Sequence, residues 1–183
     1  MKTNTNLRMI VEGGVMIALA SVLSIVTLYR MPQGGSVTAA SMMPIMLFAM
    51  RWGAIKGIVV GTLYGIIQFL IDPFMVSPIQ MLLDYPIAFG VLGFAGVVRS
   101  SLKGGKTRIR LVILGCALGM ILRMISHVIS GVVFFKEFAG GMNPWLFSIQ
   151  YNGSYMLVEL IITSILIYFI WPTVEKAAPS VIN

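Results

Sequence analysis

Charged residues are scarce in this sequence. Of its 183 residues only 10% are charged and 58% are hydrophobic, with a mean hydropathy of +0.94. Soluble domains carry about 25% charged residues, so this composition excludes a soluble protein and indicates an integral membrane protein. The length allows about six spans of about 20 residues. We therefore expect residues 1–183 to form a single transmembrane domain, with no separate nucleotide-hydrolysing domain.

Residues that support catalysis or metal binding are also few. Cys116 is the one cysteine and His127 the one histidine, beside six acidic residues. A lone cysteine excludes an internal disulfide and a cysteine metal cluster. The basic segment SSLKGGKTRIR lacks the GxxxxGK[ST] spacing of a phosphate-binding loop. The sequence therefore predicts a protein that is not an enzyme and has neither a cofactor nor a metal site.

Apolar runs predict an all-α bundle of six transmembrane helices. The second run is too short for a straight lipid-exposed span, so we expect this helix to be buried, broken or tilted. The first run lacks a clear cleavage site, which favours a retained span over a signal peptide. The six runs are Met9–Leu28, Ala39–Met50, Gly53–Ile71, Ile79–Val98, Leu111–Phe135 and Gln150–Trp171.

Basic residues between the runs predict the orientation. With the N-terminus inside, ten of them fall on the cytoplasmic side, and only Arg30 and Lys136 fall outside. The positive-inside rule therefore predicts that both termini are cytoplasmic. It also accounts for the net charge of +7 without nucleic-acid binding. The ten are Lys2, Arg8, Arg51, Lys56, Arg99, Lys103, Lys106, Arg108, Arg110 and Lys176.

Polar side chains on three helices fall at one depth in the outer part of the membrane. At about 1.5 Å per residue, the fourth, fifth and sixth helices bring a carboxylate, an imidazole, an amide and several phenols to this level. Polar groups at membrane depth are costly unless they face protein or a wet cavity. Their convergence predicts a ligand site built from Asp84, Tyr85, His127, Tyr151, Asn152 and Tyr155.

The segment YNGSYMLVE places Tyr151, Tyr155 and Glu159 on one helical stripe. Glu159 lies deeper than the tyrosines, at the same estimated depth as Arg123 on the fifth helix. We therefore expect Arg123 and Glu159 to form an internal ion pair that joins the two helices. The alternative is that Arg123, one turn below His127, forms the floor of a pocket.

Small residues in the first helix predict a close helix–helix contact. The pattern leaves open whether they pack inside the bundle or against a partner subunit. They are Gly14, Ala18, Ala20 and Ser24.

Four segments of the sequence resemble those of a known transporter family. SMMPIMLFAMRWG, LLDYPIAFGVLGFAG, SHVISGVVFF and NPWLFSIQYNGSYML are similar to segments of the thiamine-specific substrate-binding component of energy-coupling factor transporters. The resemblance implies a six-helix protein of the bacterial plasma membrane that captures thiamine from outside with high affinity. It also implies docking, through the first helix, to a transmembrane coupling protein with two ATPase subunits.

The resemblance further implies which residues bind the substrate. This sequence departs from the family pattern at three positions, with Asp84 in place of glutamate, Phe135 in place of Trp and Phe147 in place of Tyr. Trp145, in the third outer loop, is added to the set. The implied substrate-binding residues are Asp84, Tyr85, His127, Phe135, Trp145, Phe147, Tyr151 and Asn152.

Two other functions stay open at this point. One is a capture subunit for another flat vitamin, such as riboflavin. The other is a self-sufficient proton-coupled transporter in which Asp84, His127 and Glu159 relay protons. For a thiamine-capture subunit, the outer segment PQGGSVTA is flexible enough to serve as a lid over the ligand.

Overall fold

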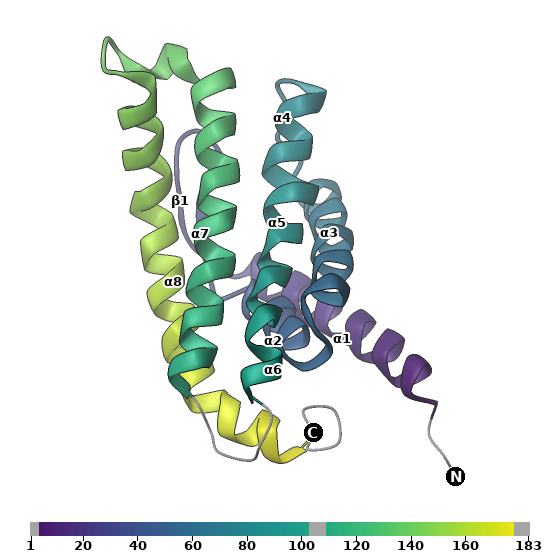
Figure 1. Cartoon of the computed structure of the whole chain (residues 1–183). Coiled ribbons are helices and arrows are strands. Elements are labelled where there is room, and N and C mark those ends of the chain that lie inside the picture. The colour runs from purple at the N-terminus through teal and green to yellow at the C-terminus, as the bar shows by residue number, and fades with distance from the viewer. Residues whose placement is uncertain (1–3, 103–108, 178–183) are drawn as a thin grey trace.

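The computed structural model describes residues 4–102 and 109–177, which form a helical bundle with one short β-hairpin (Figure 1). Lys2, Lys103, Lys106 and Arg108, used above for the orientation, lie outside the described residues. The helices are α1 (Thr5–Ile25), α2 (Met43–Trp52), α3 (Ala54–Ile71), α4 (Pro78–Leu82), α5 (Ala88–Gly90), α6 (Arg99–Leu102), α7 (Ile109–Phe134) and α8 (Pro144–Ala177).

Five segments are long and apolar enough to span a membrane: α1, α3, the continuous stretch Pro78–Leu102, α7 and α8. The sixth predicted helix, α2, has ten residues, and all of them are buried. This confirms that the second apolar run is too short for a lipid-exposed span. Its methionines join the central core of the bundle.

The stretch Pro78–Leu102 is one helical column with three kinds of turn. After α4 comes the π-helical segment η1 (Leu83–Ile87), which contains Pro86, and then α5. A tight 3₁₀ segment η2 (Val91–Val98) leads into α6. A proline removes a backbone donor, and the wider π turn accommodates that loss. Turns of this kind occur often at functional sites.

A row of glycines brings α3 against this column. Gly57, Gly61 and Gly65 recur every fourth residue, so they share one face of α3. A methyl group at Gly61 would collide with the Phe89 carbonyl, and one at Gly65 would lie 2.5 Å from the Tyr85 carbonyl. The two backbones are therefore in close contact, as small residues allow in membranes.

The segment after α1 folds into an antiparallel hairpin, β1 (Thr27–Arg30) and β2 (Ser36–Thr38). Part of this hairpin is the outer segment PQGGSVTA, which the sequence predicts to be flexible. β2 contacts α8 and is mostly buried, whereas three of the four β1 residues are exposed (Figure 1). The hairpin tip points toward the end of the bundle where α3 joins α4 and α7 joins α8.

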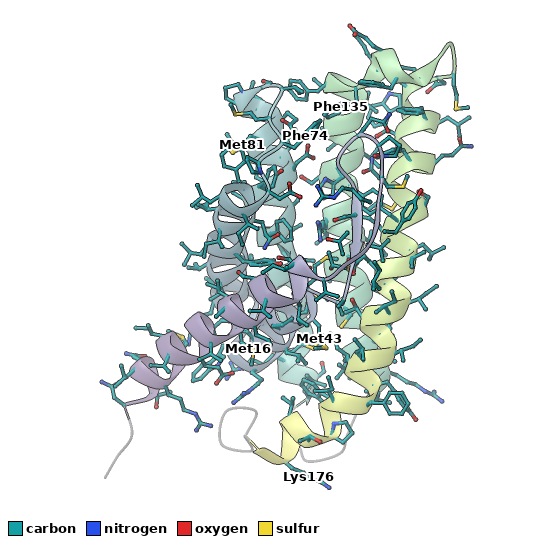
Figure 2. The ribbon with its side chains drawn as sticks, turned by 180° about the vertical axis from the view of Figure 1, so that it is seen from behind. Met16, Met43, Phe74, Met81, Phe135 and Lys176 are labelled. Atoms are coloured by element: carbon teal, nitrogen blue, oxygen red, sulfur yellow. The ribbon has the colours of Figure 1, made fainter. Side chains whose placement is uncertain are left out.

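The two ends of the bundle differ in character. Phe74 and Phe135 lie at one end and Lys176 at the other (Figure 2). The start of α1, the α2–α3 junction and the end of α8 share the end with Lys176 (Figure 1). At the α1–α2 contact, buried Arg51 pairs with Glu12 at 2.7 Å. This arrangement agrees with a basic cytoplasmic end, although the orientation itself stays a prediction.

Candidate functional site

A cavity opens between the hairpin tip, the α3–α4 connection, α7 and α8. Seven of the eight residues predicted to bind substrate line it. The eighth, Trp145, is not among the lining residues and is 54% exposed at the start of α8. The seven are Asp84, Tyr85, His127, Phe135, Phe147, Tyr151 and Asn152.

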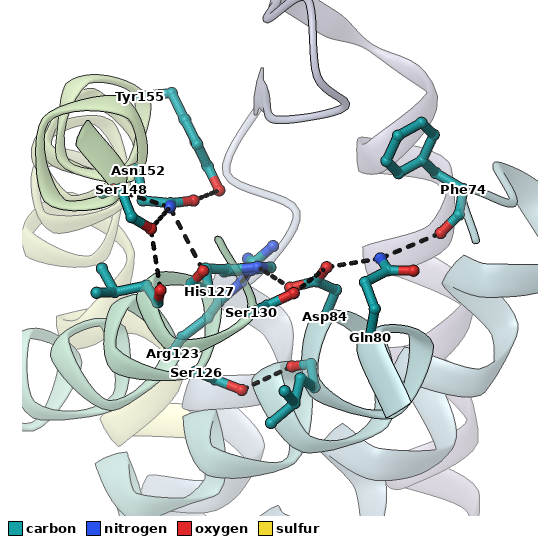
Figure 3. A network of polar contacts seen from close by, with 12 residues as sticks. Phe74, Gln80, Asp84, Arg123, Ser126, His127, Ser130, Ser148, Asn152 and Tyr155 are labelled. Carbon is teal, nitrogen blue, oxygen red and sulfur yellow. Dashed lines mark hydrogen bonds and ion pairs between the residues drawn. The ribbon is translucent and has the colours of Figure 1, made fainter. Parts of the chain in front are cut away.

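Asp84 is the centre of the polar network in this cavity (Figure 3). Its Oδ2 accepts hydrogen bonds from Gln80 Nε2 at 2.6 Å and from Ser130 Oγ at 2.9 Å. Its Oδ1 lies 2.9 Å from His127 Nδ1. Gln80 is one helical turn before Asp84, a spacing that lets the two side chains meet. The carboxylate is thus fixed in direction by two helices.

Arg123 lies one helical turn before His127 on α7 and contacts its ring. Its Nε donates to His127 Nε2 at 3.2 Å. Its guanidinium carbon lies 4.1 Å from the centre of the Phe89 ring, and Nη1 contacts the Met42 sulfur. The predicted Arg123–Glu159 ion pair is therefore wrong: it is absent among the ion pairs of the described residues.

Glu159 instead anchors the hairpin. Its Oε1 accepts from the backbone N–H of Thr38 at 2.5 Å and from the Thr38 hydroxyl at 2.7 Å. Glu159 is 1% exposed, and its other oxygen, Oε2, has no hydrogen-bond partner among the described residues. The ion pair was predicted because Glu159 and Arg123 have the same estimated depth in the membrane. In the structure, β2 lies against α8, and its Thr38 supplies the hydrogen-bond donors to Glu159. Glu159, the last residue of the YNGSYMLVE segment, thus binds the backbone of the hairpin and not a ligand.

The upper part of that segment forms a wall of the cavity. Asn152 Nδ2 donates to the Ser148 carbonyl at 2.9 Å, and Asn152 Oδ1 accepts from the Tyr155 hydroxyl at 2.8 Å. Both ends of the Asn152 amide are therefore held within the protein. Asn152, predicted from the sequence as a ligand contact, therefore also positions Tyr155.

Tyr85 ties the α3–α4 connection to the cavity. Its hydroxyl donates to the Asp72 carbonyl at 2.8 Å and accepts from the Phe74 N–H at 2.9 Å. These bonds hold Phe74, whose ring stacks on Phe135 at 6.0 Å between centroids. Opposite them, Phe147 and Tyr151 lie 6.0 Å apart. Aromatic rings therefore occupy two sides of the cavity.

The hairpin tip covers the cavity and is tied down on two sides. The Tyr151 hydroxyl accepts from the Gln33 N–H at 3.0 Å. Arg30 pairs with Asp72 at 2.8 Å, with both side chains mostly exposed. Gly34 adopts φ of 98°, a conformation that suits glycine. The tip thus lies over the site through one half-buried hydrogen bond, one exposed ion pair and the packing of Gly34 and Gly35 against the rings of Phe74 and Tyr155.

Several residues of the site were missed from the sequence. They are Gln80, Ser130 and Phe74, which line the cavity. The spacing of Gln80 and Asp84, four residues apart, was a usable signal. So was Ser130, three residues after His127 and therefore on the same helix face.

The four small residues of α1 divide between two faces. Ala20 is fully buried, and Ser24 accepts a hydrogen bond from Gln68 Nε2 at 2.9 Å. Gly14 and Ala18 are exposed, and nothing lies within 4 Å of a methyl group placed at Gly14. Only these two therefore remain available to a partner or to lipid.

Comparison with known proteins agrees with this fold. The chain is 37% identical to the thiamine transporter ThiT of Bacillus subtilis (strain 168), over 98% of both chains. It is 26% identical to ThiT of Lacticaseibacillus paracasei, over 91% of this chain and 88% of that one. The solved structure of ThiT from Listeria monocytogenes superposes with a TM-score of 0.80 at 27% identity, over 98% of this chain and 99% of that one.

A family model described as "Thiamine transporter protein" matches residues 10–178. These matches confirm the resemblance predicted from the sequence. Together with the five apolar spans, they identify a multi-pass transport protein of the bacterial cell membrane and not an enzyme. Because the family match spans nearly the whole described chain, the chain belongs to the thiamine transporter protein family.

Proposed function

We propose that this chain is a high-affinity capture subunit for thiamine that works with a separate ATP-driven module. The observation that carries the proposal is the Asp84 carboxylate, held by three donors inside a cavity with aromatic walls. Thiamine joins a permanently cationic thiazolium ring to a flat aminopyrimidine. The cavity offers the matching groups for such a ligand: one anion, stacking surfaces and directional hydrogen-bonding groups.

Each group in the cavity has a proposed role. Asp84 supplies the negative charge, and Phe135, Phe147 and Tyr151 supply rings for stacking and cation–π contact. One cation–π contact contributes about 0.5–2 kcal/mol, so several rings and a carboxylate together support tight binding. Tyr85 and Asn152 complete the set, with His127 as the imidazole beside Asp84.

The energising partner is proposed from the family resemblance and from α1. Gly14 and Ala18 leave a shallow exposed face on this helix, where a partner helix can approach closely. The proposed partner is a transmembrane coupling protein bound to two ATPase subunits. Docking on α1 leaves the cavity between α7 and α8 free to bind ligand.

Ligand titration on the purified subunit tests the first part of the proposal. Thiamine is expected to bind tightly to the isolated chain, and riboflavin is expected not to compete. Tight riboflavin binding without thiamine binding would assign the site to another vitamin.

Reconstitution tests the second part. In liposomes that contain only this chain, a pH gradient is expected to drive no thiamine uptake. Uptake under that gradient would instead support a proton-coupled transporter, whereas uptake that appears only with ATP and the coupling module supports the proposal.

A further inference from the structure

His127 lies between two charged side chains in an ordered row. Arg123 Nε donates to its Nε2 at 3.2 Å, and Asp84 Oδ1 lies 2.9 Å from its Nδ1 (Figure 3). The side chains of His127 and Asp84 are only 11% and 17% exposed. The row therefore runs from a cation, through the imidazole, to the anion that faces the cavity.

The chemistry of the guanidinium decides which imidazole nitrogen carries the proton. Arginine has five N–H donors, has no acceptor, and keeps its charge in proteins. An imidazole nitrogen that accepts from Arg123 therefore has no proton of its own. The single ring proton must lie on Nδ1, where it is donated to Asp84 Oδ1. All three donors to Asp84, from Gln80, Ser130 and His127, are then neutral groups.

The surroundings of Arg123 hold it in this role. Its guanidinium packs over the Phe89 ring and contacts the Met42 sulfur, and no carboxylate pairs with it among the described residues. The titratable groups near it are Tyr64, Asp84, Tyr155 and Glu159. Three titratable groups face His127: Arg123 from the same helix, Asp84 from η1 and Tyr155 from α8. The centroids of the His127 and Tyr155 rings are 6.5 Å apart.

We propose that Arg123 is a positioning residue that keeps His127 neutral, with its proton on Nδ1, so that the Asp84 charge stays available to a cationic ligand. An imidazolium would pair with Asp84 and would place a second positive charge beside the ligand. The benefit to ligand binding rests on the proposed function, whereas the protonation of His127 does not.

The chain offers a direct spectroscopic test, because His127 is its one histidine. The protein labelled with ¹⁵N-histidine is expected to show a protonated, pyrrole-type Nδ1 and an unprotonated, pyridine-type Nε2. This pattern is expected to hold without ligand from about pH 5 to 8, the range in which an ordinary histidine changes charge. A protonated Nε2, or an imidazolium in this range, overturns the proposal.

Two variants separate positioning from folding. Arg123→Leu removes the donor to Nε2, so thiamine affinity is expected to fall at least about tenfold between pH 8 and pH 5, while the wild type changes less than about threefold. Arg123→Lys keeps a donor with no acceptor and is expected to follow the wild type. Ile125→Leu, on the lipid-facing side of α7, is the matched control.

Each further result counts for or against the proposal. A folded Arg123→Leu protein with wild-type nitrogen signals and a flat pH profile overturns it, as does Arg123→Lys behaving like Arg123→Leu. If Arg123→Leu does not fold, the wild-type nitrogen signals still decide the question. If those signals are as expected but thiamine does not bind, the proposed function fails and the role of Arg123 in fixing the imidazole stands.

Discussion

The phenol oxygen of Tyr151 accepts a hydrogen bond from the backbone N–H of Gln33 at 3.0 Å, across 118 residues of chain. The bond ties α8 to the hairpin tip over the cavity. Tyr151→Phe removes it and keeps the ring. Since one such bond contributes about 1 kcal/mol, thiamine should dissociate about fivefold faster. Labelled-thiamine release measures this rate, with exposed Tyr168→Phe on α8 as the control. An unchanged release rate would show that the tip is held by other contacts.

Asp84 provides the second prediction. Asp84→Asn removes the charge but keeps the side-chain size, so thiamine affinity should fall more than about tenfold, since a charge-assisted contact contributes about 1.5–3 kcal/mol. Asp84→Glu keeps the charge and should retain most of the affinity. Titration calorimetry on the folded variants compares the two. Equal affinity of Asp84→Asn and the wild type would remove Asp84 from the binding site.

The Glu159–Thr38 contact replaces the ion pair expected from the sequence and gives the third prediction. Glu159→Ala and Thr38→Val should each lower thermal stability, and the double variant should lose less than the sum. The expected coupling is about 1–3 kcal/mol, because a buried network is shared. Thr163→Val is the control, since the buried Thr163 hydroxyl has no hydrogen-bond partner in the part of the chain that the structure describes. Additive losses would contradict this anchoring of the hairpin.

Glycine substitutions test the close approach of α3. Gly61→Ala places a methyl group against the Phe89 carbonyl and should lower stability by about 1–3 kcal/mol. Gly14→Ala meets no atom within 4 Å, so it controls for the change of glycine to alanine in a helix. Melting in detergent compares them, and equal melting temperatures would mean that the backbones separate at little cost.

The exposed face of α1 gives the fifth prediction. Gly14→Trp and Ala18→Trp should leave thiamine binding intact but stop vitamin uptake in cells, because they block close approach of a partner helix. Ala20→Trp should instead unfold the protein, because Ala20 is fully buried. Binding to the isolated subunit and uptake by the whole complex are measured in parallel. Normal uptake with both exposed variants would move the docking surface elsewhere.

Hydrophobicity and length predicted the spans and the burial of α2, because lipid exposure demands about 20 apolar residues and α2 has ten. Depth along each helix was also sufficient to bring Asp84, His127 and Tyr151 to one level. These features depend on distance along the membrane normal, which residue counting measures.

Direction around each helix axis was harder to predict. Arg123 and Glu159 share a depth, but Arg123 turns toward Phe89 and His127, while Glu159 meets Thr38 of the hairpin. The hairpin itself follows few signals in the sequence, because its strands have only four and three residues. A partner contributed by such a short segment is decided by tertiary packing and not by local pattern.

The π-helical turn at Leu83–Ile87 has a consequence for how this column can vary. A turn closed by i→i+5 bonds holds one more residue than an α turn, and each residue advances an α-helix by about 100°. The turn can therefore aim Asp84, which lies within it, at α7, while the stretch below keeps Gly93 against α3. The two halves have separate rotational phases. Deleting one residue within the turn would make the column one regular helix and would rotate one half relative to the other. Either Asp84 would then turn away from α7, or Gly93 would turn away from α3.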